Sequence, residues 1–491
     1  MKAYATSNNL KVTENTLKIF QEYVFSIPFD GAADKRLKPH FYKSIAYFLE
    51  HLICSATVSR GTKKRAKFKG DDIWTHSVPF PYALGREIAP AVFKRNSELQ
   101  HKRGLELLEE YKIIKIITHS NIKHKCREFC LSIKFLNNLI TCDRKQYLSR
   151  KDRYYRLADI YEKGTSWWIE DLLTSGLKDT GAIKNKTSRR DVPDKSYRDL
   201  VSQVYKSLDS LRINIDAMMD YCNKNPSVKN MSYFYNFISH MGNVETDIIS
   251  NSPLVIAYKQ FYKTASKGGR SFELGTGFQY LPKGMKWSSL AEGYNYDIKS
   301  CQLKILKMEF KRHGISRANL KLLSTEQICK ALEVEEKHAK TFRFAVIFNL
   351  GAVSTSPRSN VMRSLTKIHG SRRADKLLSK WKDTLFPLRK DLLKLVDIYS
   401  KQGRNTKHGY FVENAVGQKF NCGVLNERFV MTSAKKRKLM AHMIQGIESR
   451  AVYDFVLSNK SVCALEHDGF VSLKELQDGA WQHPYLKLVM K

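Results

Sequence analysis

The chain has 491 residues, of which 42% are hydrophobic and 11% aromatic, enough to form packed cores and to exclude an intrinsically disordered protein. It carries 84 Lys and Arg against 48 Asp and Glu, a net charge of +36 spread along the whole sequence, so the expected partners are polyanions. The first residues lack the apolar run of a signal peptide, no 18-residue apolar stretch occurs, and the nine cysteines have irregular spacing. We therefore expect an intracellular protein, cytoplasmic or nucleoid-associated, with reduced thiols and no membrane partner.

Changes in composition divide the chain into four segments. Residues 1–175 carry periodic apolar stretches and are expected to form an N-terminal domain. The Gly-, Lys- and Asp-rich run at 176–196 predicts a linker. From Tyr197 to about Asn223, apolar residues recur at helical spacing, which predicts one long amphipathic helix at the start of a helical region, 197–265. The segments that suggest chemistry all lie in residues 266–491.

The N-terminal domain contains a pattern of helix, strand, basic loop and strand. An amphipathic helix is predicted at 97–111, an apolar strand at 113–117, a basic turn at 118–125 and an alternating strand at 127–135. This order resembles a winged helix, a family in which a helix enters the DNA major groove and the basic wing contacts phosphate. The resemblance makes four cations candidate nucleic-acid contacts: Lys102, Arg103, Lys123 and Lys125. A packing module with solvated lysines would show the same pattern.

Two further polar clusters lie in this domain. The stretch at 59–70 holds six cations and no acid, so we expect an exposed loop that contacts phosphate. His119, His124, Cys126 and Cys130 are close enough in sequence to suggest a zinc site. Their spacing matches no standard ligand pattern, so ordinary turn and strand residues are the default interpretation.

Two aspartates lie where predicted strands end. In YNYDIKSCQ, at 294–302, an apolar stretch ends at Asp297, and Ile298 beside it joins the candidate metal set. Asp468 is at the apex of a turn in which Gly469 is expected to take a positive φ. If folding brings the two strand ends together, these carboxylates suit a two-metal phosphoryl transfer. A strand-capping aspartate and a structural turn explain the two strings equally well.

Two predicted helices add candidate nucleotide contacts. Lys340, Phe344 and Phe348 share one helix face, where a cation and two aromatics could hold a triphosphate and a base. A core helix with a snorkelling lysine is the structural alternative. A second helix, at 435–457, places Arg437, Ala441 and Gln445 on one face, and Gly446 would allow close approach of backbone or nucleic acid.

In this order the segments resemble the family A DNA polymerases and, more distantly, the single-subunit phage RNA polymerases. The resemblance covers about residues 265–475 and rests on five motifs in series. They are matched by Gly269, Arg270, Gln279 and Pro282 for the T-G-R to N-L-Q-N-I-P segment, Asp297 to Gln302 for D-Y-S-Q-I-E, Lys340, Phe344 and Phe348 for the fingers helix, Arg437 and Ile444 to Gly446 for the I-Q-G helix, and His467 and Asp468 for V-H-D-E.

The chain also departs from the family pattern. Glu336 stands where the family has an Arg on the fingers helix, which makes the adjacent Lys337 an alternative phosphate contact. Asn349 replaces the glycine that follows the fingers-helix aromatic, and Gly469 replaces the Glu after the second aspartate. The H-D-x-F form of the last motif is closer to the RNA polymerases.

The resemblance implies an α+β right-hand polymerase, with a palm sheet and mostly helical fingers and thumb. Asp297 and Asp468 would hold two Mg²⁺ ions, with Mn²⁺ as an alternative, and Lys340 would neutralise the pyrophosphate. Phe344 and Phe348 would stack on the nucleotide and the template base. Gln302 would face the sugar of the incoming nucleotide, where its size favours deoxynucleotides. The remaining matches would contact nucleic acid: Arg270, Gln279, Arg437, Gln445 and His467.

The expected function is a template-directed nucleotidyltransferase, with a DNA polymerase that extends a primer as the first choice. Its partners would be a template, a primer and nucleoside triphosphates. A single-subunit RNA polymerase or primase-like enzyme is an alternative, as is a replication initiator with an inactive palm. A metal-dependent nuclease also uses paired carboxylates, but it would not need the face formed by Lys340, Phe344 and Phe348.

Overall fold

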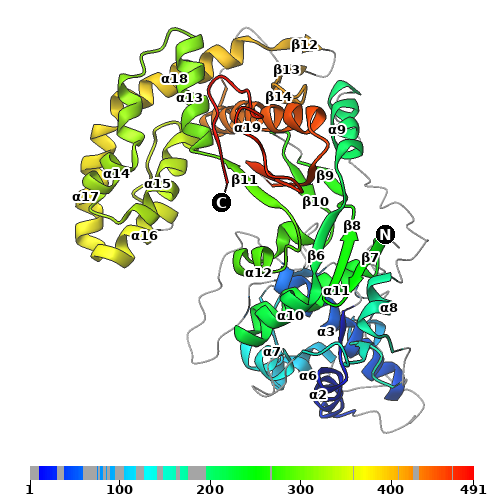
Figure 1. The fold of residues 1–491 in the computed structure, drawn as a ribbon. Helices are drawn as coiled ribbons and strands as arrows, with labels where there is room; N and C mark the ends of the chain where they lie inside the picture. Colours follow the sequence, from blue (N-terminus) through cyan, green and yellow to red (C-terminus); the bar gives the residue numbers. More distant parts are fainter. Residues whose placement is uncertain are drawn as a thin grey trace. The chain divides into compact units, whose positions relative to one another are not determined.

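The chain folds into two compact units that alternate along the sequence in the computed structural model (Figure 1). Met1–Asn185, Ser210–Gln260 and Glu273–Glu292 form the first unit, and Lys186–Asp209, Phe261–Phe272 and Gly293–Lys491 form the second unit. This division differs from the contiguous segments that composition predicts. The structure describes residues 10–29, 38–58, 75, 78–80, 85, 89–93, 104–117, 127–140, 148–161, 166–174, 195–265, 268–357, 359–406, 409–423, 431–466 and 468–490.

The first unit combines helices with small antiparallel sheets. Its described helices are α2 (Glu14–Phe25), α3 (Lys38–Val58), α5 (Pro90–Phe93), α6 (Gly104–Glu110), α7 (Ile133–Ile140), α8 (Ile169–Thr174), α10 (Ile215–Lys224), α11 (Val228–Met241) and α12 (Lys283–Ser288), with the 3-10 helix η2 (Phe278–Tyr280). Its strands are β1 (Lys11–Thr13), β2 (Val78–Phe80), β3 (Ile114–Ile116), β4 (Arg127–Leu131), β5 (Tyr154–Arg156), β6 (Leu211–Asn214), β7 (Thr246–Asn251) and β8 (Leu254–Tyr258). They pair as β1-β5, β2-β4-β3 and β6-β8-β7.

The single helix predicted over Tyr197–Asn223 is wrong, because β6 interrupts it. Leu211 and Ile213 are fully buried and alternate along β6, which pairs with β8, so the apolar spacing here serves a strand. Asn214 then starts α10 as its N-cap, with a side-chain oxygen that accepts a 2.9 Å hydrogen bond from the Ala217 N–H.

Two of the expected boundaries change as a result. The region at 197–265, expected to be helical, also contains β6, β7, β8 and β9 (Tyr262–Thr264). The predicted linker at 176–196 lies outside the described residues except for Lys195 and Ser196, which already belong to α9 (Lys195–Ser207).

The predicted winged-helix segment is described only in part. α6, β3 and β4 are present, but the strand predicted at 127–135 ends at Leu131, because Phe135 and the next apolar residues are spaced for α7. The basic loop at 59–70 and the candidate contacts Lys102, Arg103, Lys123 and Lys125 lie outside the described residues, as do His119, His124 and Cys126. Cys130 is buried, and burial raises the pKa of its thiol to about 11.

The second unit contains the segments that resemble polymerase motifs. Its described helices are α9, α13 (Cys301–Arg312), α14 (Thr325–Leu332), α15 (Glu336–Phe348), α16 (Asn360–His369), α17 (Ser371–Thr384), α18 (Phe386–Lys401) and α19 (Ser433–Ser458), with the 3-10 helix η3 (Ala318–Leu323). Its strands are β9, β10 (Ser271–Glu273), β11 (Tyr294–Ile298), β12 (Arg404–Thr406), β13 (Gly409–Glu413), β14 (Lys419–Gly423), β15 (Val462–Leu465), β16 (Gly469–Ser472) and β17 (Leu488–Met490), and Glu273 at the end of β10 belongs to the first unit.

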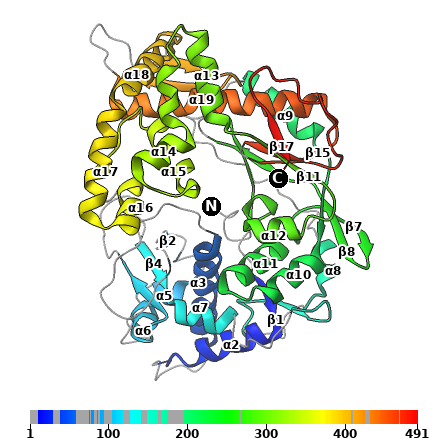
Figure 2. The same cartoon turned by 60° about the vertical axis from the view of Figure 1, so that its left-hand side comes forward.

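The core of the second unit is one cluster of buried residues that comes from an antiparallel sheet, α19 and the surrounding helices. The sheet has the strand order β15-β16-β11-β17, and α13 and α9 pack against α19 (Figure 2). One helical group consists of α14, α15, α16 and α17. Within it, α17 packs against α18, α14 against η3 and α15 against α19. The predicted strand ending near Asp297, the two predicted helices around Lys340 and Gln445, and the hairpin around Asp468 are confirmed as elements.

The fold as a whole is a mixture of helix and strand, as an α+β class requires. None of the described helices is long and apolar enough to cross a membrane.

Candidate active site

The two aspartates predicted to hold metal lie at the same end of neighbouring strands. β11 and β16 are the two middle strands of the four-stranded sheet, and Asp297 pairs with Gly469 across them. The backbone N–H of Ile298 donates a 2.9 Å hydrogen bond to the carbonyl oxygen of Asp468. Both aspartates are half-buried. Two carboxylates that are far apart in sequence therefore come from adjacent positions on one sheet.

Gly469 allows β11 and β16 to approach this closely. A Cβ atom at position 469 would lie 2.0 Å from the carbonyl oxygen of Tyr296, well inside contact distance. The φ angle of Gly469 is not positive, so the expected reason for this glycine, a left-handed turn, is wrong. The rings of Tyr296 and Phe470 pack with centroids 5.7 Å apart and hold the same pair of strands together.

The oxygen donors near this strand end are few. In the described part of the chain, no group of three or more His, Cys, Asp or Glu side chains is arranged to hold a metal ion. Asp297 and Asp468 contribute two carboxylates there, and the backbone contributes carbonyl oxygens. The side chain of Ile298 is apolar and 1% exposed, so only its carbonyl oxygen can serve the role predicted for it.

The turn after β11 directs Gln302 into the core. Ser300 has a φ of +52°, a left-handed conformation that reverses the chain into α13. Cys301 and Gln302 are consequently 1% and 4% exposed. The side-chain N–H of Gln302 donates a 2.6 Å hydrogen bond to Oε2 of Glu448 in α19.

Glu448 is the candidate functional residue that the sequence reasoning missed. Its side chain is fully buried, and Oε1 accepts a 2.7 Å hydrogen bond from Nε of Arg270 and lies 2.6 Å from Nη2 of the same guanidinium in an ion pair. Burial raises the pKa of Glu448 to about 7, although the Arg270 guanidinium opposes the shift, and the negative charge of Asp468 adds to it. Glu448 therefore joins Arg270 and Gln302, and its protonation is coupled to one of the two aspartates.

A signal for Glu448 is visible in the sequence. Ile444, Glu448 and Val452 recur at a spacing of four on the buried face of α19, so a single acid interrupts an apolar stripe. A buried carboxylate needs a cation or several donors. Arg270, from a different motif, meets that need.

Two consecutive glycines place Arg270 against α19. Gly268 and Gly269 both have a φ of +80°, and a Cβ atom on Gly268 would lie 2.2 Å from Oε1 of Gln445. The Gly268 N–H donates a 3.1 Å hydrogen bond to Nδ1 of His442, which is buried in α19. The turn between β9 and β10 is thus fixed on α19, and Gln445 lies beside it.

The other predicted residues of α19 differ in how much space surrounds them. Arg437 is exposed near the start of the helix, and Ala441 is half-buried. Gly446 was expected to admit backbone or nucleic acid, but the side chain of Asn414 fills this place. A Cβ atom at position 446 would lie 2.6 Å from Cβ of Asn414.

The predicted nucleotide face of α15 lies away from the core side of that helix. The buried side of α15 includes Phe342 and Val346, whereas Lys340 is exposed and Phe344 and Phe348 are half-buried. Nζ of Lys340 is 5.6 Å from the ring centroid of Phe344, and the centroids of Phe344 and Phe348 are 6.3 Å apart. The core-helix alternative therefore fails for Lys340 and Phe344, whereas Phe348 also packs against the core of the second unit.

Two further candidates have partners within the chain. Nζ of Lys337 lies 2.6 Å from a carboxylate oxygen of Glu335, and both side chains are largely exposed. Gln279 belongs to the first unit, is 4% exposed, and accepts a 2.9 Å hydrogen bond from the Glu273 N–H, so the structure gives it an internal role. His467 lies outside the described residues.

Neither a protein-family model nor a curated protein sequence matches this chain. We therefore infer a function for this chain from the chemistry and the arrangement of the residues above.

Proposed function

We propose that this chain is a template-directed nucleotidyltransferase, and specifically a DNA polymerase that extends a primer. The observation that carries the proposal is the placement of Asp297 and Asp468 at the same end of the two middle strands of one sheet. In a right-hand polymerase this sheet would be the palm, and the helical group from α14 to α17 would belong to the fingers.

The donor set suits the metal ions that phosphoryl transfer uses. Asp297 and Asp468 offer carboxylate oxygens and Ile298 a carbonyl oxygen, which are ligands that Mg²⁺ and Mn²⁺ prefer. Bound there, two Mg²⁺ ions would activate the primer 3′-hydroxyl and stabilise the pyrophosphate leaving group. The half-burial of both aspartates leaves them accessible to such ligands.

The exposed face of α15 supports a role in binding the nucleotide. Lys340 would bind the triphosphate and neutralise charge on the leaving group, because its ammonium group is exposed. Phe344 and Phe348 would stack against the base, since both rings are only half-buried, although Phe348 also packs against the core.

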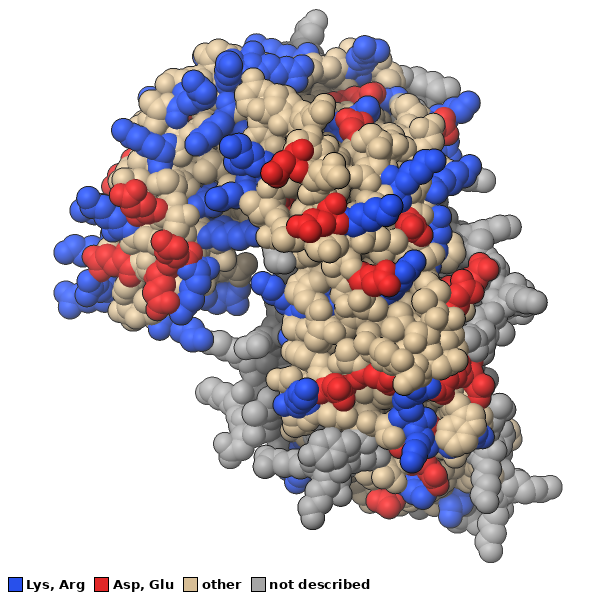
Figure 3. Space-filling model, viewed as in Figure 1, with Lys and Arg blue, Asp and Glu red and all other residues tan. Residues whose placement is uncertain are grey.

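Further residues would hold the primer and template. Arg437 is an exposed cation that suits a phosphate contact. The Arg270 guanidinium, held by Glu448, and the side chain of Gln445 both lie where the turn between β9 and β10 meets α19, and there they would contact the primer end. The net charge of +36 supports a polyanionic partner, and Lys and Arg side chains are spread over the face in Figure 3.

A nucleotide-dependence experiment tests this function. The purified chain is incubated with Mg²⁺, a labelled primer on a DNA or RNA template, and either deoxynucleotides or ribonucleotides. A polymerase lengthens the primer only when complementary nucleotides are present. A nuclease shortens the primer without nucleotides, and a non-catalytic initiator leaves it unchanged, so either result would refute the proposal.

A further inference from the structure

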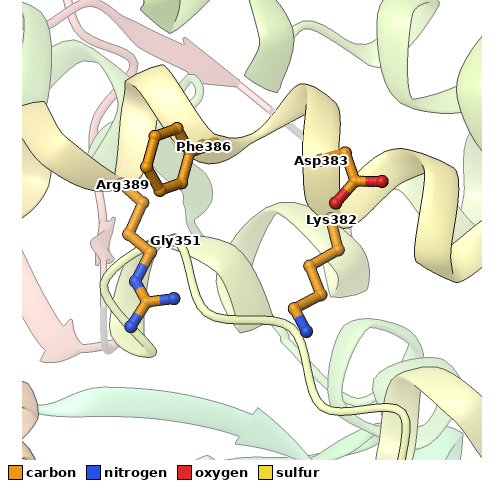
Figure 4. Close-up of a pocket in the computed structure, with 5 residues that line it drawn as sticks. All are labelled: Gly351, Lys382, Asp383, Phe386 and Arg389. Atoms are coloured by element: carbon orange, nitrogen blue, oxygen red, sulfur yellow. The ribbon is translucent and has the colours of Figure 1, made fainter.

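A surface pocket lies where the turn after α15 meets the start of α18. It has a volume of about 290 Å³ and is lined by Gly351, Lys382, Asp383, Phe386 and Arg389 (Figure 4). All of these residues belong to the second unit. None of them matches a polymerase motif, and the function proposed above does not use them.

Gly351 shapes the pocket because only glycine fits there. Its φ is +74°, and a Cβ atom would lie 2.7 Å from both Cα and Cβ of Arg389. The turn after α15 therefore runs directly against the first turn of α18. In sequence, this turn follows Phe348, the last residue of the candidate nucleotide face, by three residues.

Phe386 is an unusual residue for such a surface. Its side chain is 55% exposed at the first position of α18, so its ring contributes little apolar burial to the fold. Nζ of Lys390 lies 4.7 Å from the ring centroid, and this cation–π contact holds the ring at the surface. An exposed aromatic ring among cations is the combination that binds unpaired bases, because stacking tolerates any base and cations hold the phosphates.

The charges around Phe386 favour an anionic ligand. Lys382 and Arg389 are exposed, and Asp383 is the only acid among the described residues of the lining. Residues 371–401 hold nine Lys and Arg against four Asp. The carboxylate of Asp383 can accept a hydrogen bond from an exocyclic amino group of a base.

The volume of the pocket suits one nucleotide of a longer strand better than a complete small-molecule ligand. Pockets that enclose a small molecule usually measure about 300–1,000 Å³, and this one is at the lower limit of that range. One base with its sugar and phosphate would leave the neighbouring nucleotides to follow the cationic surface of α17 and α18.

We propose that this pocket is a binding subsite for single-stranded nucleic acid, with one base stacked on Phe386 and the adjacent phosphates at Lys382 and Arg389. The inference rests on the proposed function only in expecting nucleic acid as the partner. The subsite would bind an unpaired strand with or without catalysis.

The test measures binding of a fluorescent single-stranded oligothymidylate to the full chain by anisotropy, in EDTA so that no metal-dependent reaction occurs. Phe386→Ala should weaken binding by about 5- to 100-fold, whereas Phe386→Trp should keep it because an indole also stacks. Arg389→Gln should reduce the slope of log K against log salt by about 0.7, the value for one phosphate contact on a single strand. Lys401→Gln removes a positive charge from the same helix but outside the pocket, so it is the control for loss of charge alone. This variant should bind the oligothymidylate more tightly than Arg389→Gln does.

Photocrosslinking locates the contact directly. An oligonucleotide with one 5-iodouracil should form an adduct within residues 382–390, and Asp297→Asn protein should form the same adduct. Unchanged binding by Phe386→Ala, an adduct elsewhere in the chain, or an equal loss of affinity for blunt duplex would overturn the subsite. An adduct at Phe386 in a protein that synthesises nothing would refute the polymerase proposal and leave the subsite standing.

Discussion

Gly469 lies directly opposite Asp297 across β11 and β16, at a distance that leaves no room for a side chain. A Cβ atom there would meet the carbonyl oxygen of Tyr296 at 2.0 Å and Cα of Asp297 at 3.0 Å. The spacing of the two strands, and with it the separation of Asp297 and Asp468, therefore depends on this glycine.

Gly469→Ala should push β16 away from β11 and impair the site. The overpacking should cost about 1–3 kcal/mol of stability and should reduce synthesis at least about tenfold, because the two aspartates would separate. Gly104→Ala is the control, since Gly104 has no positive φ and its Cβ position meets no atom closer than 3.4 Å. Thermal unfolding and primer extension measure both effects. Full activity of Gly469→Ala would mean that the strand spacing does not set the geometry of the site.

Glu448→Gln should change how stability depends on pH. The pKa of Glu448 in the folded chain is about 7, above the 4.5 of an unperturbed glutamate, so the unfolded chain loses this proton first. The contribution of Glu448 to the free energy of unfolding is therefore largest below pH 4.5 and falls by roughly 3 kcal/mol as the pH rises to 7. Glu448→Gln should lack this decline. Urea denaturation at pH 4.5 and at pH 7 measures the free energy of unfolding of both proteins. The same decline in both proteins would contradict the assignment.

Under the proposed function, Glu448 should also influence the requirement for Mg²⁺. Its ionised form adds negative charge near Asp468, so the Mg²⁺ concentration for half-maximal synthesis should fall as the pH rises through 7. Glu448→Gln should need more Mg²⁺ and should lose this trend. Glu309→Gln removes another buried carboxylate, one that accepts a hydrogen bond from Tyr399, and should keep the trend. A trend retained in Glu448→Gln would separate Glu448 from the metal site.

Lys340→Ala should lower the rate of synthesis and weaken nucleotide binding by about 10- to 100-fold, because the triphosphate would lose a charge-assisted contact. Lys337→Ala is the matched control on the same helix, since the partner of Lys337 is Glu335. Single-nucleotide incorporation kinetics give the rate and the apparent affinity. Greater damage from Lys337→Ala would show that the helix presents a different cation to the nucleotide.

Gln302 sets the expected choice of sugar. Because Gln302 is only 4% exposed, a direct contact with the sugar requires its side chain to leave Glu448. Under the proposed function, a side chain of this size should then crowd a ribose 2′-hydroxyl, so deoxynucleotides should be preferred and Gln302→Ala should accept ribonucleotides more readily. Because Gln302 also donates to the buried Glu448, the substitution will affect stability, and the ratio of dNTP to NTP incorporation is the proper measurement. A wild-type preference for NTPs that the variant retains would overturn both the DNA polymerase proposal and the role of Gln302.

The sequence predicts the local elements of the second unit well. The apolar strand before Asp297, the aromatic face of α15 and the long helix with Gln445 follow from residue spacing over short distances. The hairpin around Asp468 follows from its turn residues, although the need for Gly469 comes from a strand far away in sequence. Local spacing cannot reveal such a contact.

Long-range pairing also explains the other differences. Leu211 fits the helical period of its neighbours, but it alternates with Ile213 in β6 because both residues pair with β8. Glu448 appears as one polar residue on a helix, and its importance becomes visible only when Arg270 and Gln302 come from two other segments to meet it. The sequence therefore predicts which segments carry chemistry better than it predicts the contacts among them.

The most direct test of the central claim is primer extension with Mg²⁺ by the wild-type chain, Asp297→Asn and Asp468→Asn, with duplex binding measured in parallel. Each substitution keeps the size of the side chain and removes a charged oxygen ligand, so synthesis should be abolished while binding through Lys and Arg persists. We expect template-dependent extension by the wild type alone. Full synthesis by either variant, or none by the wild type on any template and nucleotide combination, would contradict the account.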